Sequence, residues 1–377
     1  MHDYDIAIIG AGPAGATLAR LIGERYRVLL VERRPVDGPE GFLAGKCCGG
    51  LLAPDAQGML SRLGLGLPKE VLEDPQLFVV RAIDIPRRVE RYYQRHYINM
   101  DRQRFDRWLV SMVPTGVDRR LGCRLRAYAP EGEGFRLVLR QGGREVQETA
   151  RIVVGADGAM SRVRAGLHLS TPSPTRYFAI QEWVEAGENV PYFSSIFDPE
   201  VTDYYCWTIP KDDRLVIGAA LRPRDRTHDR FELLKRRLRD YGFRFGQTVW
   251  REGTFMLRPQ TVLQVSTGGK GVLLVGEAAG WISPSSAEGL SYAFRSARIL
   301  AEVLRVGLED VGRRYSRAAL PLKRNLFLKG LKSRVVFSPS LRRVIMRIGI
   351  RSMDIHEGGQ PVPRGCPSGR TSCIPGG

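Results

Sequence analysis

Short apolar runs separated by glycine-rich and polar segments follow one another along this chain of 377 residues. Two segments near the N-terminus, Tyr4 to Ile9 and Arg27 to Glu32, have the length and apolar character of buried strands. A stretch with helical character, through about Glu24, lies between them. Strands buried on both faces are typical of parallel sheets, because helices cover both sides of such a sheet. The pattern therefore predicts a βαβ unit at the start of the chain.

Further strands and one helix are predicted downstream. Apolar runs predict strands within residues 78–100, and two alternating stretches at 123–128 and 135–141 predict a β-hairpin. Between these parts, Asp101 stands where a helix N-cap is expected, so the sequence predicts a helix over residues 102–110.

The second half of the chain has a different pattern. Residues 177–265 alternate apolar and polar positions around one charged helix at 229–241, which predicts an antiparallel sheet. Residues 290–350 are predicted to be helical, and the last 25 residues, rich in Gly, Pro and Ser, to be flexible. Residues 41–58 are rich in glycine and small side chains, so a loop is predicted there.

These elements predict an α/β fold. We expect a Rossmann-like dinucleotide-binding domain in three layers, with a mostly parallel sheet, an inserted antiparallel β-sheet substrate domain and a C-terminal helical segment. The expected boundaries are 1–75, 95–170 and 265–315 for the discontinuous nucleotide-binding domain, 76–94 and 171–264 for the substrate domain, 316–352 for a basic helical region and 353–377 for a flexible tail.

A glycine motif follows the first predicted strand directly. Gly10, Gly12 and Gly15 have the G-x-G-x-x-G spacing, which lets the backbone turn tightly and approach a pyrophosphate at the helix N-terminus. Glu32 ends the second strand, 17 residues past Gly15, and is followed by Arg33. An acid at this place can bind the ribose hydroxyls of an adenosine. The motif fits either NAD or FAD.

A second segment, residues 276–293, distinguishes between these two cofactors. It follows the apolar strand 271–275 and contains an acid, small residues, a proline and a glycine that opens a helix. Glu277 can hold ribityl or ribose hydroxyls, and the free N–H groups after Gly289 can face the electron-rich edge of a flavin. We therefore predict FAD as the cofactor. The alternative is a buried strand and loop that pack against a helix.

Two more segments are predicted to meet the same flavin. Asp157 and Gly158 form a turn after another buried strand, and Arg102 at a helix start can pair with pyrophosphate or hold the adjoining loop. The alternative is that Arg102 is a surface helix residue in this arginine-rich chain. The cofactor-binding residues predicted from these patterns are Gly10, Gly12, Pro13, Ala14, Gly15, Glu32, Arg33, Arg102, Asp157, Gly158, Gly276, Glu277, Ala279, Gly280, Gly289 and Leu290.

Three stretches together resemble the geranylgeranyl reductase family, within the p-hydroxybenzoate hydroxylase-like FAD-dependent oxidoreductases. They are Lys46-Cys-Cys-Gly-Gly50, Tyr205-Cys-Trp-Thr-Ile-Pro-Lys211 and residues 276–293, and the resemblance covers about residues 1–320. The chain departs from the family at Glu277, where Asp is usual, and at Ile209, where an aromatic residue is commoner.

The resemblance implies roles for residues that the patterns alone do not assign. It places Lys46, Cys48 and Gly49 near the flavin, with Cys48 as the active-site cysteine, and it makes Tyr205 and Trp207 walls of a lipid cavity. The implied activity is reduction of carbon–carbon double bonds in a polyprenyl, geranylgeranyl-type lipid. The same residues could instead pack as loop and sheet core, without a substrate.

Two other activities stay open on this scaffold. One is an FAD-dependent monooxygenase or halogenase, because residues 205–210 partly match a halogenase Trp-x-Trp-x-Ile-Pro pattern. The other is a membrane-surface flavoprotein that passes electrons to quinone. The electron donor is expected to be NAD(P)H or a ferredoxin, because FAD occupies the one complete dinucleotide motif.

Charge adds one expectation about partners. The net charge is +18, and residues 311–351 contain twelve Lys or Arg and no Asp or Glu. Basic and apolar residues alternate within 321–350, which is typical of a helix on an anionic membrane surface, although a solvated basic face is the simpler alternative. Nucleic acid is not expected, since no recognition motif accompanies the charge.

Cellular location and metal content follow from further absences in the sequence. No signal peptide and no apolar run of spanning length is present, so we expect a cytoplasmic protein whose membrane contact is peripheral, on the inner face. The six cysteines show no metal-site spacing, so no metal is expected.

Overall fold

The computed structural model describes residues 2–35, 47–187, 191–223 and 226–353. Lys46 and residues 354–377, which include most of the predicted tail, lie outside the described residues. The strands are β1 Tyr4–Ile9, β2 Val28–Glu32, β3 Leu51–Leu52, β4 Leu77–Asp84, β5 Val89–Asn99, β6 Asp118–Leu121, β7 Cys123–Glu131, β8 Gly134–Gln141, β9 Arg144–Gly155, β10 Thr175–Ala186, β11 Phe193–Phe197, β12 Cys206–Lys211, β13 Arg214–Leu221, β14 Phe245–Arg258, β15 Gly268–Gly269 and β16 Val272–Leu274.

The α-helices are α1 Pro13–Ile22, α2 Pro54–Arg62, α3 Arg102–Ser111, α4 Arg162–Ala165, α5 Thr227–Tyr241, α6 Leu290–Leu304, α7 Val311–Ala318, α8 Leu320–Phe337 and α9 Pro339–Ile348. Short 3-10 turns cover Lys69–Val71, Ile85–Arg87, Val262–Gln264 and Gly276–Ala279.

The first sheet has the order β15-β16-β9-β1-β2-β6. The five strands from β16 to β6 run parallel to one another, and β15 is antiparallel to β16. β7 and β8 extend it as an antiparallel meander joined to β9. The parallel part arises because β1 and β2 are apolar along almost their whole length and are covered by helices. The predicted Rossmann-like α/β fold is confirmed.

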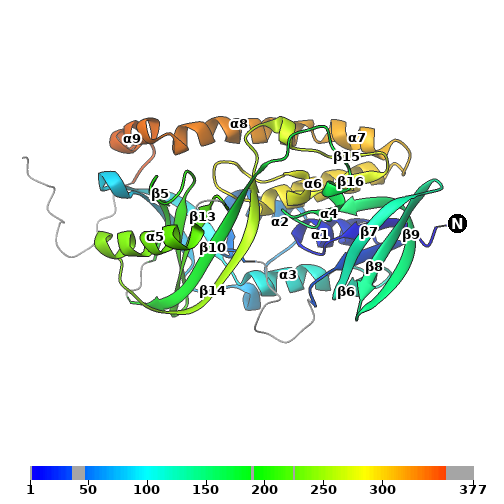
Figure 1. Cartoon of the computed structure of the whole chain (residues 1–377), viewed down its shortest axis with the longest axis horizontal. Coiled ribbons are helices and arrows are strands. Elements are labelled where there is room, and N and C mark those ends of the chain that lie inside the picture. Colours follow the sequence, from blue (N-terminus) through cyan, green and yellow to red (C-terminus); the bar gives the residue numbers. More distant parts are fainter. Residues whose placement is uncertain (1, 36–46, 188–190, 224–225, 354–377) are drawn as a thin grey trace, which may run out of the picture.

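The second sheet has the order β14-β10-β13-β12-β11-β4-β5-β3. Its pairs are antiparallel, as predicted, except that β11 runs parallel to β4. β5 continues to Asn99, across the expected domain boundary at residue 95. Figure 1 shows this sheet beside the first one, with α7, α8 and α9 forming a layer across the top of both.

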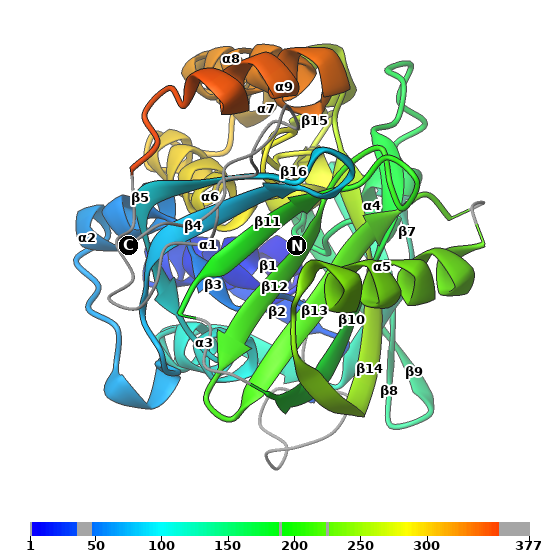
Figure 2. The same ribbon diagram turned by 90° about the vertical axis from the view of Figure 1, so that its left-hand side faces the viewer.

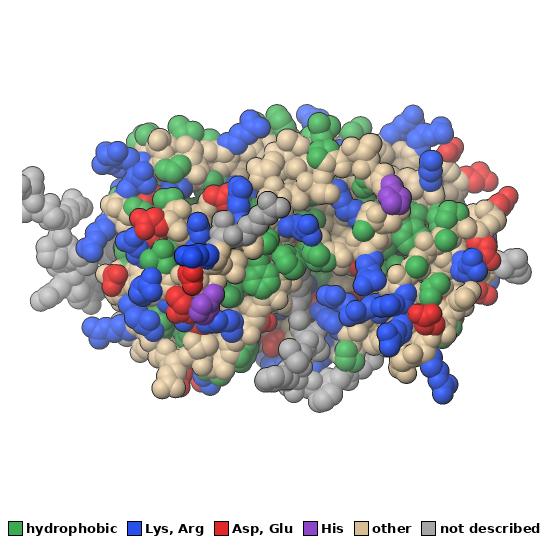
Figure 3. Space-filling view, in the orientation of Figure 1, with side chains coloured by type: hydrophobic (Ala, Val, Ile, Leu, Met, Phe, Trp, Pro, Cys, Tyr) green, Lys and Arg blue, Asp and Glu red, His purple; other side chains and the backbone are tan. Residues whose placement is uncertain are grey.

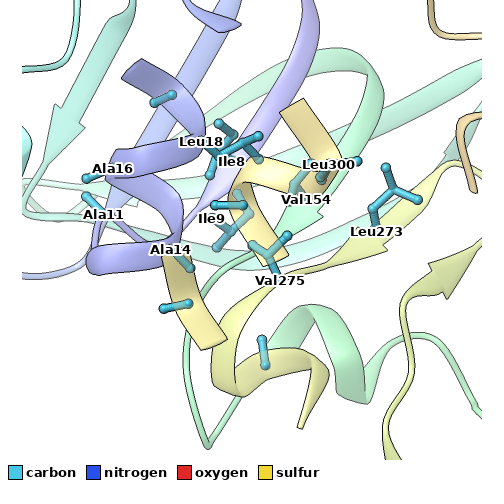
Figure 4. Packing of buried hydrophobic residues seen from close by; sticks show 14 of the residues in the cluster. Ile8, Ile9, Ala11, Ala14, Ala16, Leu18, Val154, Leu273, Val275 and Leu300 are labelled. Carbon is cyan, nitrogen blue, oxygen red and sulfur yellow. The ribbon is translucent and has the colours of Figure 1, made fainter. Parts of the chain in front are cut away.

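The core of the nucleotide-binding part lies between β1, α1 and α6. Figure 4 shows Leu18 of α1 beside Ile8 of β1 and close to Leu300 of α6, while Ala14 of α1 lies nearer Ile9. Small residues on α1 let that helix lie close to the strand, which positions its N-terminus over the carboxyl end of β1.

One element differs from the sequence prediction. The loop expected over residues 41–58 ends early, because α2 begins at Pro54 and buries Ala56, Met59 and Leu60. Proline at the first helical position has a suitable φ and lacks only an N–H that the helix would leave unpaired. The residues before Pro54 are rich in glycine, so the sequence pattern does not indicate where this helix begins.

The helix predicted after Asp101 is confirmed. The Asp101 carboxylate accepts hydrogen bonds from the backbone N–H groups of Gln103 and Arg104 at 2.7 and 2.8 Å.

The C-terminal helices are fixed to the second sheet by buried polar contacts. Arg342 of α9 pairs with Asp84 at 2.9 Å, and Arg258 of β14 donates to the Ser333 hydroxyl of α8 at 3.1 Å. The Arg258 guanidinium also lies 4.1 Å from the ring centre of Tyr204 and 4.5 Å from that of Phe337. Helix α8 therefore forms a wall against the second sheet.

Candidate active site

The β1–α1 turn is built for close backbone approach. Gly10 has φ +105°, and a Cβ there would lie 2.5 Å from the carbonyl oxygen of Ala156. A Cβ on Gly15 would overlap the carbonyl oxygen of Gly10. Both positions therefore require glycine, so that β1, α1 and the segment after β9 can meet.

Three of the predicted cofactor segments follow neighbouring parallel strands. Gly10 follows β1, Asp157 lies just after β9, and Gly276 lies just after β16. The backbone N–H of Ala156 donates to the Ile9 carbonyl at 2.7 Å, which joins the first two segments. Ligands of open α/β sheets bind outside the carboxyl ends of the strands, where these three segments meet.

A cavity of about 1360 Å³ runs from this edge to the second sheet. Most predicted site residues line it: Gly10, Gly12, Pro13, Ala14, Glu32, Arg33, Cys48, Gly49, Arg102, Asp157, Gly158, Tyr205, Trp207, Gly276, Glu277, Gly289 and Leu290. Gly15, Ala279 and Gly280 do not line it and instead shape the turns beneath.

The nucleotide end of the cavity has the chemistry that FAD requires. A Cβ on Gly12 would meet no protein atom within 4 Å, so the cavity reaches the backbone at the N-terminus of α1, where N–H groups can face a pyrophosphate. The carboxylate of Glu32 accepts from the Ala11 N–H at 2.9 Å and from the Arg34 N–H at 3.0 Å. The Arg34 guanidinium donates to the same carboxylate at 3.0 Å. A carboxylate has about four acceptor sites, so about one stays available for a ribose hydroxyl. The residues present therefore fit the cofactor.

A chain of ion pairs links the adenosine side of the cavity to the cysteine loop. Arg34 contacts Glu32 at 3.0 Å and Asp106 at 3.5 Å, and Asp106 pairs with Arg102 at 2.9 Å. Burial opposes the charge of Arg102, but Asp106 and a side-chain hydrogen bond with Cys48 raise its pKa. Arg102 is thus a cation of the cavity wall, paired with Asp106, and is not a free surface residue.

Lys211 fixes the other side of the cysteine loop. Its ammonium is buried, donates to the carbonyls of Met100 at 2.7 Å and Gly50 at 3.3 Å, and pairs with Glu73 at 2.7 Å. Burial lowers the pKa of Lys211. This buried lysine therefore ties residues 47–50 to the end of β5 and positions Cys48 in the cavity wall.

Two predicted cofactor carboxylates also hold the protein itself. Asp157 accepts from the Ser161 hydroxyl and from the N–H groups at the start of α4, and burial raises its pKa. Glu277 accepts from the Leu257 N–H at 2.9 Å and lines the cavity. Both acids thus tie the cofactor end to neighbouring backbone, and Glu277 joins it to β14 of the second sheet.

The far end of the cavity is aromatic. The ring centres of Tyr205 and Trp207 lie 5.6 Å apart, and the Tyr205 hydroxyl donates to the Ser286 carbonyl at 3.0 Å. Burial raises the pKa of Tyr205 well above its usual value, so it stays neutral. The remaining aromatic wall consists of Tyr93, Tyr97, Phe193, Phe197, Phe255 and Phe337.

Several of these residues were missed in the sequence. Arg34 stands two residues after Glu32, and Asp106 stands four residues after Arg102 on one helix face, so local spacing could have indicated both. The cavity cations Arg95, Lys332 and Arg351 come from distant segments and give no local signal.

This fold and site define an FAD-binding oxidoreductase. A family model described as an FAD binding domain matches residues 3–327. Among curated proteins, Protein CbrA of Escherichia coli O6:H1 (strain CFT073) is 41% identical over 350 residues, which cover 93% of this chain and 94% of the relative. The chain therefore belongs to the FAD binding domain family, and FAD is its cofactor.

Solved structures with low identity share the fold. A geranylgeranyl bacteriochlorophyll reductase-like protein of Thermoplasma acidophilum has a TM-score of 0.78 at 17% identity, covering 92% of this chain and 91% of that one. PqsL of Pseudomonas aeruginosa, a probable FAD-dependent monooxygenase, has a TM-score of 0.66 at 19% identity, covering 92% and 99%. These likenesses establish the architecture alone.

The described residues also bear on metal binding and on membrane crossing. Within the described residues, no group of His, Cys, Asp and Glu is arranged to hold a metal ion. None of the helices in the described part of the chain has both the length and the apolar character needed to cross a bilayer.

Proposed function

We propose that this protein reduces carbon–carbon double bonds of a polyprenyl lipid and is a geranylgeranyl reductase-like enzyme. The observation that carries the proposal is one continuous cavity, which joins the FAD end to an aromatic chamber behind Tyr205 and Trp207. A flavin site open to bulk water would not suit an apolar chain, whereas a chamber of this kind removes the chain from water.

The proposed reaction adds a hydride to one alkene carbon and a proton to the other. Bound FAD in its reduced form supplies the hydride, and NAD(P)H or a ferredoxin supplies the electrons that reduce it. An isolated alkene carries no charge to bind, so the protein must act by positioning the chain and excluding water. Tyr205 serves this purpose because its hydroxyl is anchored to the Ser286 carbonyl, which fixes the ring beside the segment 285–290.

Cys48 is the proposed proton donor. It is half-buried, lines the cavity and lies beside the charged Arg102 side chain. Its backbone carbonyl accepts from the Gln181 side chain at 3.3 Å, which fixes the loop against β10. Cys47 also lines the cavity, but it is more deeply buried than Cys48 and its thiol donates to the Ala179 carbonyl at 3.9 Å. The two cysteines therefore differ in what their thiols contact.

The substrate is proposed to reach the cavity from an anionic membrane surface. Large apolar side chains are exposed along α8 and α9, namely Leu320, Phe327, Leu328, Leu331, Leu341, Val344 and Ile348. They recur at helical spacing and alternate with exposed Arg324, Arg334, Arg343 and Arg347. In Figure 3, green apolar side chains and blue basic side chains lie side by side along the upper edge of the molecule. Such a surface fits the interface of an anionic bilayer.

Anaerobic incubation of the FAD-loaded protein with geranylgeranyl substrates and a chemical reductant tests the reaction. The expected product is heavier by one H₂ for each reduced bond, as measured by mass spectrometry. An unchanged mass for every polyprenyl substrate contradicts the proposal. Substrate-coupled oxygen consumption would instead favour a monooxygenase or halogenase, and quinone reduction without a saturated product would favour an electron-transfer flavoprotein.

A further inference from the structure

Helix α6 begins where the nucleotide end of the cavity meets the aromatic chamber. Its first turn packs against the nucleotide end, since a Cβ on Gly276 would lie 3.9 Å from the Cα of Ala293. The segment just before the helix reaches the chamber, where the Ser286 carbonyl accepts from the Tyr205 hydroxyl at 3.0 Å. Figure 2 shows α6, in yellow, beneath the layer of α8 and α9. We therefore expect a flavin ring that extends from the nucleotide end toward the chamber to reach the start of this helix.

A carboxylate stands at the start of α6. Glu288 lines the cavity and comes directly before Gly289, the N-cap of the helix. Its two oxygens accept hydrogen bonds from the N–H and the hydroxyl of Ser291, both at 2.6 Å. An ionised carboxylate accepts at both oxygens in this way. Glu288 thus takes up one of the N–H groups that a helix N-terminus leaves without an internal partner.

Backbone contacts fix the loop that carries this carboxylate. The Ser283 N–H donates to the Glu288 carbonyl at 2.9 Å, and the Ala287 N–H donates to the buried Tyr204 hydroxyl at 3.0 Å. These bonds do not involve the Glu288 side chain. The position of the carboxylate is therefore set by the loop and does not depend on its own charge.

The charge of Glu288 is only partly offset by its surroundings. Burial raises the pKa of Glu288, and the hydrogen bonds from Ser291 oppose that shift. Lys329 of α8 also favours the ionised form, but its ammonium pairs with Asp55 at 3.3 Å. A helix N-terminus alone presents a partial positive charge to a neighbouring ligand. The ionised carboxylate reverses the sign of that charge at the start of α6.

We propose that Glu288 lowers the reduction potential of the bound FAD. Two electrons and one proton convert the neutral flavin ring into a reduced ring with one negative charge, which a nearby carboxylate repels. NAD(P)H or a ferredoxin supplies the electrons, as in the proposed reaction. The inference rests on the proposed function for its purpose, because an isolated alkene is a weak hydride acceptor and its reduction requires a strongly reducing flavin.

Redox titration of the FAD-loaded protein, without any lipid, tests this inference with Glu288→Gln. Glutamine keeps the shape of the side chain and can still accept from the Ser291 N–H, so the helix start is preserved. The ratio of reduced to oxidised flavin at a fixed potential should rise at least about tenfold, which is about 30 mV for a two-electron couple. Glu302→Gln is the matched control, since Glu302 is exposed near the other end of α6 and pairs with Arg298.

Ser291→Ala separates the charge from the helix start. It removes a hydroxyl contact of Glu288 and keeps the carboxylate, so it should shift the potential far less than Glu288→Gln. If a variant loses FAD, its affinities for oxidised and reduced FAD give the same quantity, because their ratio fixes the potential of the bound cofactor. Glu288→Gln should favour reduced FAD by the same factor.

Equal potentials in the wild type and Glu288→Gln would overturn the inference. A shift of the same size and sign in Ser291→Ala or Glu302→Gln would overturn it as well. A shifted potential in a protein that reduces no alkene would support the role of Glu288 and contradict only the proposed reaction. An unshifted potential in a protein that does reduce alkenes would contradict only the role of Glu288, so the two failures are distinguishable.

Discussion

The two ends of the cavity are built in different ways. At the nucleotide end, backbone geometry does most of the positioning, because Gly10 and Gly15 allow contacts that any side chain would block. At the chamber end, side chains from β5, β11, β12, β14 and α8 supply the wall. The first end is thus specified by a local motif, and the second depends on tertiary assembly. Single substitutions at the nucleotide end should therefore affect FAD binding, and those at the chamber end should affect lipid binding.

The largest effect is expected at the β1–α1 turn. Gly15→Ala places a methyl group against the Gly10 carbonyl, so the turn must open and the protein should lose FAD and stability together. Gly12→Ala meets no protein atom within 4 Å and intrudes only on the cavity. It should lower FAD content with the melting temperature of the FAD-free protein unchanged. Equal loss of stability in both variants would contradict this distinction.

Cys48→Ala tests the cavity between the two ends. If Cys48 supplies the proton, product formation should fall by about a hundredfold while FAD content and lipid affinity stay constant. Cys47→Ala is the matched control, because that thiol faces the Ala179 carbonyl. A pH profile of the remaining activity should also change shape in Cys48→Ala. Full activity with an unchanged profile would assign Cys48 a packing role.

A smaller effect is expected in the aromatic chamber. Trp207→Leu removes part of the apolar wall, so affinity for a geranylgeranyl substrate should fall by about tenfold, while FAD content should match the wild type. Visible absorbance of the bound flavin and a lipid titration measure the two quantities separately. Loss of FAD with unchanged lipid affinity would place Trp207 at the cofactor instead.

The smallest effect concerns the support of the second sheet. Glu182 is fully buried, and although burial opposes its charge, hydrogen bonds from Arg251, Lys235 and Thr248 lower its pKa below the usual 4.5. A lowered folded-state pKa stabilises the fold above that usual value, and the contribution is lost as pH falls through the folded pKa. Glu182→Gln should cost about 1 kcal/mol at neutral pH.

Chemical denaturation as a function of pH measures this contribution. The difference in unfolding free energy between wild type and Glu182→Gln should shrink as the pH falls toward 4 and below. Asp229→Asn, at an exposed position of α5, is a suitable control with little expected change. A difference that is constant with pH would mean that ionisation of Glu182 is not what stabilises the sheet.

The same contrast explains what could be predicted from the sequence. Asp101 and the first glycine motif act on residues close to them in the chain, so spacing was sufficient to identify them. Lys211 donates to the Met100 carbonyl 111 residues away, and nothing in its local sequence indicates that contact. The start of α2 at Pro54 could not be predicted, because the glycine-rich residues before it are typical of a loop. The predicted domain boundaries and the assigned site roles stay predictions.

The most direct test follows reduced flavin in the absence of oxygen. The FAD-loaded protein is reduced chemically, excess reductant is removed, and flavin absorbance is recorded after mixing with geranylgeranyl diphosphate. The flavin should be reoxidised without oxygen, with one double bond saturated for each flavin. Flavin that stays reduced with every polyprenyl substrate, and is reoxidised only when oxygen is admitted, would contradict the proposed reductase.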